Sequence, residues 1–82
     1  MKMKLRYNVK RGENMFRNLN AEMSRIGLKA KEMYKDIPHI KSYDTLRNKL
    51  NGKTQFTLED MSFIKMKWFP NLTLDYLFEK ST

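Results

Sequence analysis

The chain has 82 residues, of which 17 are Lys or Arg and nine are Asp or Glu, giving a formal net charge of +8. A chain of this length builds one modest hydrophobic core, with no room for a second domain or a deep substrate cavity. The lack of cysteine excludes disulfides, thiolate chemistry and the usual zinc knuckles, and no window offers the roughly 18 apolar residues of a membrane span. A cytoplasmic protein with a polyanionic partner is expected.

Residues 1–14 hold five Lys or Arg against one Glu, and their apolar side chains are scattered. This composition predicts a flexible basic N-terminal arm. A second interpretation is a translated leader, because the KRGE sequence at 10–13 can be encoded by a purine-rich run of the ribosome-binding type just upstream of Met15. On either interpretation the folded domain spans residues 15–82.

From Met15 onward apolar residues recur at helical spacing, and the run ends at Gly27. A second, shorter helix is expected over residues 28–37. It ends at Pro38, because proline has no backbone N–H to donate and restricts the residue before it. The apolar faces of these two helices are predicted to contribute Phe16, Leu19, Met23, Ile26, Leu28, Met33 and Ile37 to the core.

Ser42 is expected to cap a third helix over residues 43–51. Its apolar positions, Leu46 and Leu50, are four apart and therefore fall on one face, while the polar side chains fall on the others. The Asn-Gly pair at 51–52 ends this helix, since glycine readily takes the left-handed conformation that a helix C-terminus requires. A short helix that buries two leucines and exposes its hydrogen-bonding side chains is predicted.

Thr57 and Asp60 form a variant of the capping-box pattern at the start of a fourth helix. The Pro-Asn pair at 70–71 ends that helix, and Thr73 is expected to cap a last short helix. No stretch alternates with period two for long enough to predict a strand, so the fold class is all-α with five helices. The inner faces of the last two helices are predicted to be Leu58, Met61, Ile64, Trp68, Leu74 and Leu77.

Three segments of the chain together resemble the phage repressor and Cro-like helix-turn-helix family, also called the XRE group. They are RNLNAEMSRIGLKAKEM at 17–33, TLRNKLNGKTQFTLED at 45–60 and FPNLTLDYLF at 69–78. The resemblance covers most of the chain and implies a five-helix repressor-like domain over residues 15–82. It also implies a sequence-specific transcriptional regulator of phage type that binds a double-stranded DNA operator through its third helix.

The resemblance further implies a homodimer, and the last helix, from Thr73 to Lys80, is the candidate interface. Four aromatic residues lie near this helix: Trp68, Phe69, Tyr76 and Phe78. They fit either core packing or a dimer interface, where aromatic residues are enriched.

Carried over by position, the resemblance assigns DNA contacts to the third helix and its surroundings. The side chains expected to face base edges are Tyr43, Asp44, Arg47 and Asn48. The residues expected to contact the DNA backbone are Lys29, Lys31, Lys41, Thr45, Lys49, Asn51, Lys53 and Thr54. Arginine can form paired bonds with guanine, asparagine with adenine, and a carboxylate can accept from cytosine. For Asp44 an ordinary first-turn carboxylate, stabilised by the helix dipole, is an equal alternative.

The chain departs from the family pattern around the turn. Lys29 and Ala30 stand where Thr-Gln usually opens the second helix, Tyr34 replaces a small residue, and Pro38 replaces the turn glycine. The connection PHIKSY, residues 38–43, is longer than usual. These departures leave a second interpretation, a protein-interaction module such as an antirepressor or an inhibitor of a host factor, which keeps the fold but has lost base readout.

Enzymatic activity is not expected, because the chain offers no nucleophile with a candidate base, no glycine-rich phosphate loop and no metal-spaced cluster. His39 has no second histidine or cysteine to complete a metal site and is interpreted as a loop residue. The adjacent carboxylates Glu59 and Asp60 are explained by their place at a helix start. No cofactor, metal or small-molecule substrate is expected.

Overall fold

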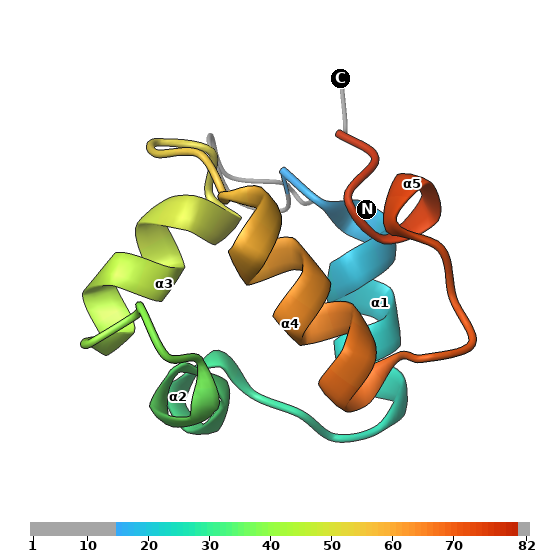
Figure 1. Ribbon diagram of the computed structural model, residues 1–82, viewed down its shortest axis with the longest axis horizontal. Coiled ribbons are helices and arrows are strands. Elements are labelled where there is room, and N and C mark those ends of the chain that lie inside the picture. Colours follow the sequence, from blue (N-terminus) through green and yellow to red (C-terminus); the bar gives the residue numbers. More distant parts are fainter. Residues whose placement is uncertain (1–14, 81–82) are drawn as a thin grey trace, which may run out of the picture.

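A computed structural model of the protein describes residues 15–80, which are helical and contain no strand. The elements are α1 (Arg17–Arg25), α2 (Ala30–Met33), a single 3-10 turn η1 (Tyr34–Asp36), α3 (Tyr43–Leu50), α4 (Leu58–Trp68) and α5 (Leu74–Leu77) (Figure 1). The predicted all-α class with five helices is confirmed. The predicted arm or leader lies outside the described residues.

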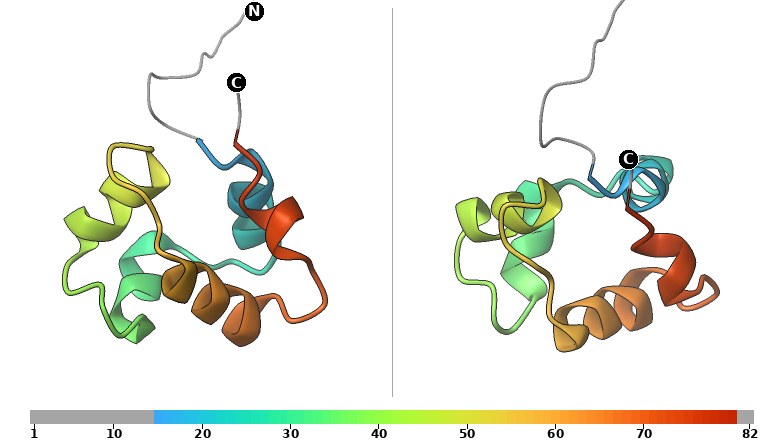
Figure 2. Two further views of the ribbon diagram at one scale, coloured as in Figure 1. Left: turned by 45° about the horizontal axis from the view of Figure 1, so that its top comes forward. Right: turned by 90° about the horizontal axis from the view of Figure 1, so that it is seen from above.

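Helix α4 lies between two groups of elements, with α2 and α3 on one side and α1 and α5 on the other (Figures 1 and 2). Each helix contributes side chains to a single core between them. The buried core residues are Phe16, Leu19, Met23, Met33, Ile37, Ile40, Leu46, Phe56, Ile64, Phe69 and Leu77. Half-buried side chains that pack against this core include Leu28, Leu50, Met61 and Trp68.

The predicted helix starts at α3, α4 and α5 are confirmed. The hydroxyls of Ser42 and Thr73 each accept a hydrogen bond of 3.1 Å from the backbone N–H three residues on. At α4 the capping box is complete: the Asp60 N–H donates to Thr57 Oγ1 at 3.0 Å, and the Thr57 N–H donates to Asp60 Oδ2 at 3.2 Å. These short-range bonds satisfy N–H groups that have no partner within their helices.

Two residues predicted to lie in the core are exposed instead. Ile26, with 54% of its surface exposed, is the C-cap of α1, where the chain leaves the helical path and turns the side chain outward. Leu58, 66% exposed, is the first residue of α4 and faces away from the core that Ile64 enters. Both errors arose because helical spacing was extended to a position at the end of a helix, beyond Arg25 of α1 and at the first residue of α4.

The predicted second helix is shorter and divided. Its expected start, Leu28, still belongs to the end of α1, since its N–H donates to the Met23 carbonyl at 2.8 Å. Helix α2 therefore begins at Ala30 and tightens into η1 at Tyr34. Helix α5 also ends earlier than predicted, at Leu77 rather than Lys80.

Helix α5 packs against α1 and α4 through its own apolar and polar groups. Phe78 stacks edge-on against Phe16 and Phe56, with ring centroids 5.7 and 5.2 Å apart. The hydroxyl of Tyr76 donates to Glu22 Oε2 at 2.8 Å, and this hydrogen bond raises the pKa of Tyr76. Asn18 also donates to the Tyr76 carbonyl at 2.9 Å. Tyr76 and Phe78, which belong to the predicted dimer interface, thus contact residues of their own chain.

Gly52 ends α3 with a left-handed backbone, φ +86°, and its N–H donates to the Lys49 carbonyl at 3.2 Å. The Met15 side chain lies where a β-carbon would be placed. We expect Gly52→Ala to lower the free energy of unfolding by roughly 1–2 kcal/mol, the cost of a left-handed alanine, because the flexible end of the Met15 side chain can move aside. Gly27→Ala is the matched control, because Gly27 has φ +70° and open space around it, and it should lose a similar amount. A much larger loss for Gly52→Ala in urea denaturation would show that Met15 cannot move.

Candidate nucleic-acid interface

Helix α3 is held to the domain by its apolar side and by both of its ends. Leu46 is buried and Leu50 is half-buried, as their spacing predicted, and the helix packs on α2 and η1. Its N-terminus is capped by Ser42, and its C-terminus is closed by the N–H of Lys53 donating to the Asn48 carbonyl at 2.9 Å. Figure 1 shows α3 at the outer edge of the molecule, away from α1 and α5. Its polar side is therefore presented on a fixed support.

Three side chains from two helices meet at the start of α3. Lys31 Nζ of α2 lies 5.9 Å from the centroid of the Tyr43 ring, and the Arg47 guanidinium lies 6.0 Å from it. Cations at this distance are attracted to an aromatic face. We call Lys31, Tyr43 and Arg47 the Tyr43 cluster. It joins one predicted backbone-contact residue to two predicted base-contact residues.

The other predicted base-contact residues lie on the same helix. Asp44 is exposed in the first turn of α3, and Asn48 is half-buried one turn further along. Thr45 is half-buried, and its hydroxyl is within hydrogen-bond distance of the Ser42 hydroxyl, 3.0 Å away. Thr45 therefore supports the start of the helix, and its side-chain oxygen is already engaged.

Most of the predicted DNA-backbone contacts lie at the surface around α3. Lys29 comes directly before α2, Lys41 precedes α3, and Lys53 follows it. The exposed members of the set are Lys29, Lys31, Lys41, Lys53 and Thr54. Asn51 is the C-cap of α3 and is half-buried.

Lys49 is placed differently from the other basic residues. Its side chain is only 14% exposed, with Nζ 3.2 Å from Asp60 Oδ2 and donating to the Gln55 carbonyl at 3.0 Å. Asp60 is 2% exposed, and its Oδ1 has no hydrogen-bond partner among the described residues. Lys49 thus joins α3 to the start of α4, and a phosphate contact would require it to leave a buried carboxylate.

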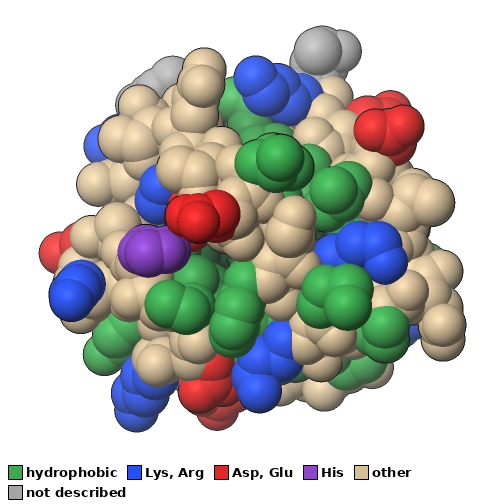
Figure 3. All heavy atoms as spheres, viewed as in Figure 1, with side chains coloured by type: hydrophobic (Ala, Val, Ile, Leu, Met, Phe, Trp, Pro, Cys, Tyr) green, Lys and Arg blue, Asp and Glu red, His purple; other side chains and the backbone are tan. Residues whose placement is uncertain are grey.

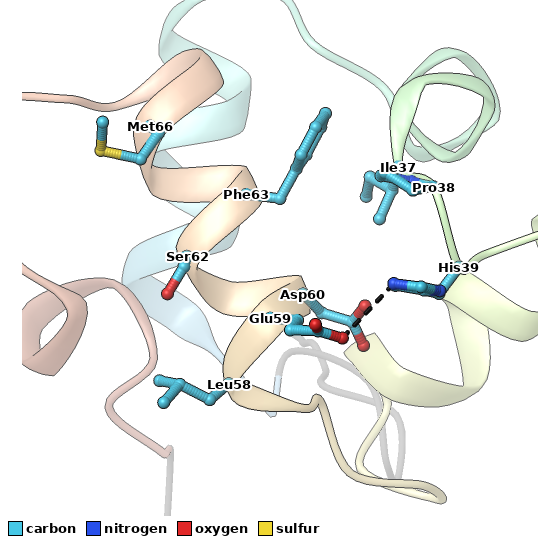
Figure 4. A pocket seen from close by; sticks show the side chains of 9 residues that line it. All are labelled: Ile37, Pro38, His39, Leu58, Glu59, Asp60, Ser62, Phe63 and Met66. Atoms are coloured by element: carbon cyan, nitrogen blue, oxygen red, sulfur yellow. Dashed lines mark ion pairs between the residues drawn. The ribbon is translucent and has the colours of Figure 1, made fainter.

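Two contacts that the sequence did not predict hold the long connection before α3 in place. Ile40 is buried, and its N–H donates to the Ile37 carbonyl at 3.1 Å. His39 Nε2 lies 3.3 Å from Glu59 Oε1, which joins the loop to α4 (Figure 4). In the sequence, only the apolar character of Ile40 between the polar His39 and Lys41 indicated that its side chain is buried.

A surface pocket of about 570 Å³ separates this connection from α4. Phe63 extends from α4 toward Ile37 and Pro38 of the connection (Figure 4). At the start of α4 the pocket is lined by Glu59, which is paired with His39, and by the buried Asp60. Within residues 15–80 no three His, Cys, Asp or Glu side chains are placed to hold a metal ion, and no helix is long and apolar enough to cross a bilayer.

The chain matches no protein-family model, no curated protein and no solved structure. The interpretation of this surface therefore depends on the residues themselves and on the resemblance of the sequence motifs.

Proposed function

We propose that the protein is a sequence-specific, double-stranded DNA-binding transcriptional regulator of the phage repressor and Cro type. In this proposal α3 enters the major groove, and a homodimer occupies two half-sites about 34–36 Å apart. A bound dimer would exclude polymerase from the promoter. The observation that carries the proposal is the Tyr43 cluster, which places an aromatic ring and two cations from α2 and α3 on one outward surface.

The proposed reading of bases depends on the fixed support of α3. A helix fits the major groove, which is about 12 Å wide, and caps at both ends hold its side chains in register. Arg47 would donate two bonds to a guanine, and Asn48 would pair with an adenine. Tyr43 would orient the Arg47 guanidinium through the ring contact at 6.0 Å. Asp44 would accept from a cytosine amino group.

The proposed phosphate contacts come from the exposed lysines, Lys29, Lys31, Lys41 and Lys53, and exclude Lys49. Each phosphate that a lysine neutralises releases condensed counterions, so affinity should fall steeply with salt. Lys49 instead joins α3 to α4, because its Nζ lies 3.2 Å from Asp60 Oδ2. This ion pair would hold α3 in place while its exposed residues contact DNA.

Selection of a random duplex library on the purified protein, at roughly physiological salt, tests this proposal. We expect recovery of a palindromic site whose half-sites are about one helical turn apart. A parallel selection with a chain starting at Met15 measures what residues 1–14 add to affinity. Recovery of no preferred sequence would contradict the proposal and favour the alternative, a protein-interaction module that has lost base readout.

A further inference from the structure

Apolar side chains lie exposed along one face of α4. Leu58 and Met66 are 66% and 69% exposed, and Ser62, which is half-buried, lies midway between them. Positions four and eight apart fall in one line along a helix. Figure 3 shows apolar side chains gathered over α4 on this side of the molecule. We call Leu58, Ser62, Met66 and the adjoining pocket wall of Phe63 the α4 face.

The α4 face is the part of the surface best suited to take the place of α5 as a dimer contact. Leu77 of α5 is buried in the core, and Tyr76 is bonded to Glu22 at 2.8 Å. An isolated exposed apolar side chain needs no explanation, whereas Leu58 and Met66 lie in line on one helix beside the pocket wall that Phe63 forms.

We propose that a second copy of this chain binds the α4 face, with the two α4 helices antiparallel across a twofold axis near Ser62. In a twofold interface, residue i contacts j while j contacts i. Because Leu58 and Met66 are equally far from Ser62 in the helix, the axis places Leu58 of one copy opposite Met66 of the other. The small serine at the centre lets the two helices approach closely.

Charge along α4 favours a second copy over another partner. Its first turn carries Glu59, which is exposed although it lies 3.3 Å from His39 within its own chain, and its last turn carries Lys67, which is also exposed. Antiparallel packing sets the acidic first turn of each helix beside the basic last turn of the other. This pairing places opposite charges at the contact of two chains that each carry a net charge of +8. It also aligns the two helix dipoles favourably.

This surface leaves the proposed DNA-binding residues uncovered. In Figure 1, α3 lies at the outer edge, beside the side of α4 that faces the viewer. The inference rests on the proposed function, because binding to two half-sites requires a dimer. Self-association can nevertheless be measured without DNA.

Sedimentation or light scattering over a concentration series measures the association. We expect the wild-type chain to approach twice the 9.9 kDa of one copy. Met66→Glu places a carboxylate opposite Leu58 of the other copy, in the apolar part of the contact, and should raise the dimer dissociation constant about tenfold or more. Ile26→Glu is the matched control, since it changes an exposed apolar side chain on α1 and should leave the dimer intact. A wild-type chain that stays monomeric, or equal effects of the two variants, would overturn the inference.

A charge exchange tests the antiparallel orientation. Glu59→Lys and Lys67→Glu should each weaken self-association, because each homodimer then opposes like charges. An equal mixture of the two variants should recover the wild-type mass, since the mixed dimer restores both opposite-charge contacts. Failure of the mixture to associate would contradict this orientation. Recovery of an operator by a chain whose mass is insensitive to these changes would reject the α4 face and leave the DNA-binding proposal standing.

Discussion

Replacing Lys49 by methionine is expected to lower the free energy of unfolding by about 3–5 kcal/mol, a large part of the total for a domain of this size. The loss follows from Asp60, whose carboxylate is 2% exposed and would be left in the interior without the ammonium 3.2 Å away. Asp60 Oδ1 already has no hydrogen-bond partner among the described residues, so the remaining bond to the Thr57 N–H could not compensate. Urea denaturation followed by circular dichroism measures the effect.

Two further variants separate the buried pair from the loss of any lysine. Lys53→Met removes an exposed lysine from the same turn and should change stability by no more than about 0.5 kcal/mol. Adding Asp60→Asn to Lys49→Met removes the unpaired charge but keeps an acceptor for the Thr57 N–H, so part of the lost stability should return. If Lys49→Met is as stable as Lys53→Met, the ion pair between Lys49 and Asp60 does not stabilise the fold.

The double variant Arg47→Ala with Asn48→Ala is expected to weaken binding to a selected operator by at least about 30-fold, because each paired base contact is worth about 1–3 kcal/mol. Alanine is a strong helix former, so the helical spectrum should be unchanged. Weak, salt-sensitive binding to unrelated duplexes should persist through the exposed lysines. Fluorescence anisotropy on specific and unrelated duplexes measures both quantities.

A matched control for this variant lies on α1. Ser24→Ala with Arg25→Ala removes the same charge, at exposed positions on the other side of α4 from α3. Its operator affinity should stay close to that of the wild-type protein. Full operator affinity in the α3 double variant would show that α3 does not read the bases.

Local chemistry made the starts of α3, α4 and α5 and the end of α3 predictable. The Ser42, Thr57 and Thr73 caps depend on bonds across three residues, and Gly52 depends on its own backbone angle. The core was predictable where helical spacing continued inside a helix, but not at helix ends such as Ile26. Ile40 was missed because it lies in a loop, where no periodic pattern indicates which way a side chain points.

The contacts that define the candidate site are long-range and were not predictable from spacing. The approach of Lys31 to Tyr43 depends on the angle between α2 and α3, across a connection of unusual length. The partner of Lys49 was hidden because Asp60 was already explained by its role as a cap. A buried carboxylate needs a cation nearby. A position for Asp60 on the buried side of α4 would therefore have indicated that a basic residue such as Lys49 lies beside it.

Chemical probing of a selected duplex with dimethyl sulfate measures whether α3 lies in the major groove of a specific site. This reagent methylates guanine N7 in the major groove and adenine N3 in the minor groove. If α3 binds there, guanine N7 should be protected in two blocks about 10–10.5 base pairs apart, and Arg47→Ala should lose protection at one guanine per half-site. Protection of adenine N3 alone, or of no base at all, would contradict this placement of α3.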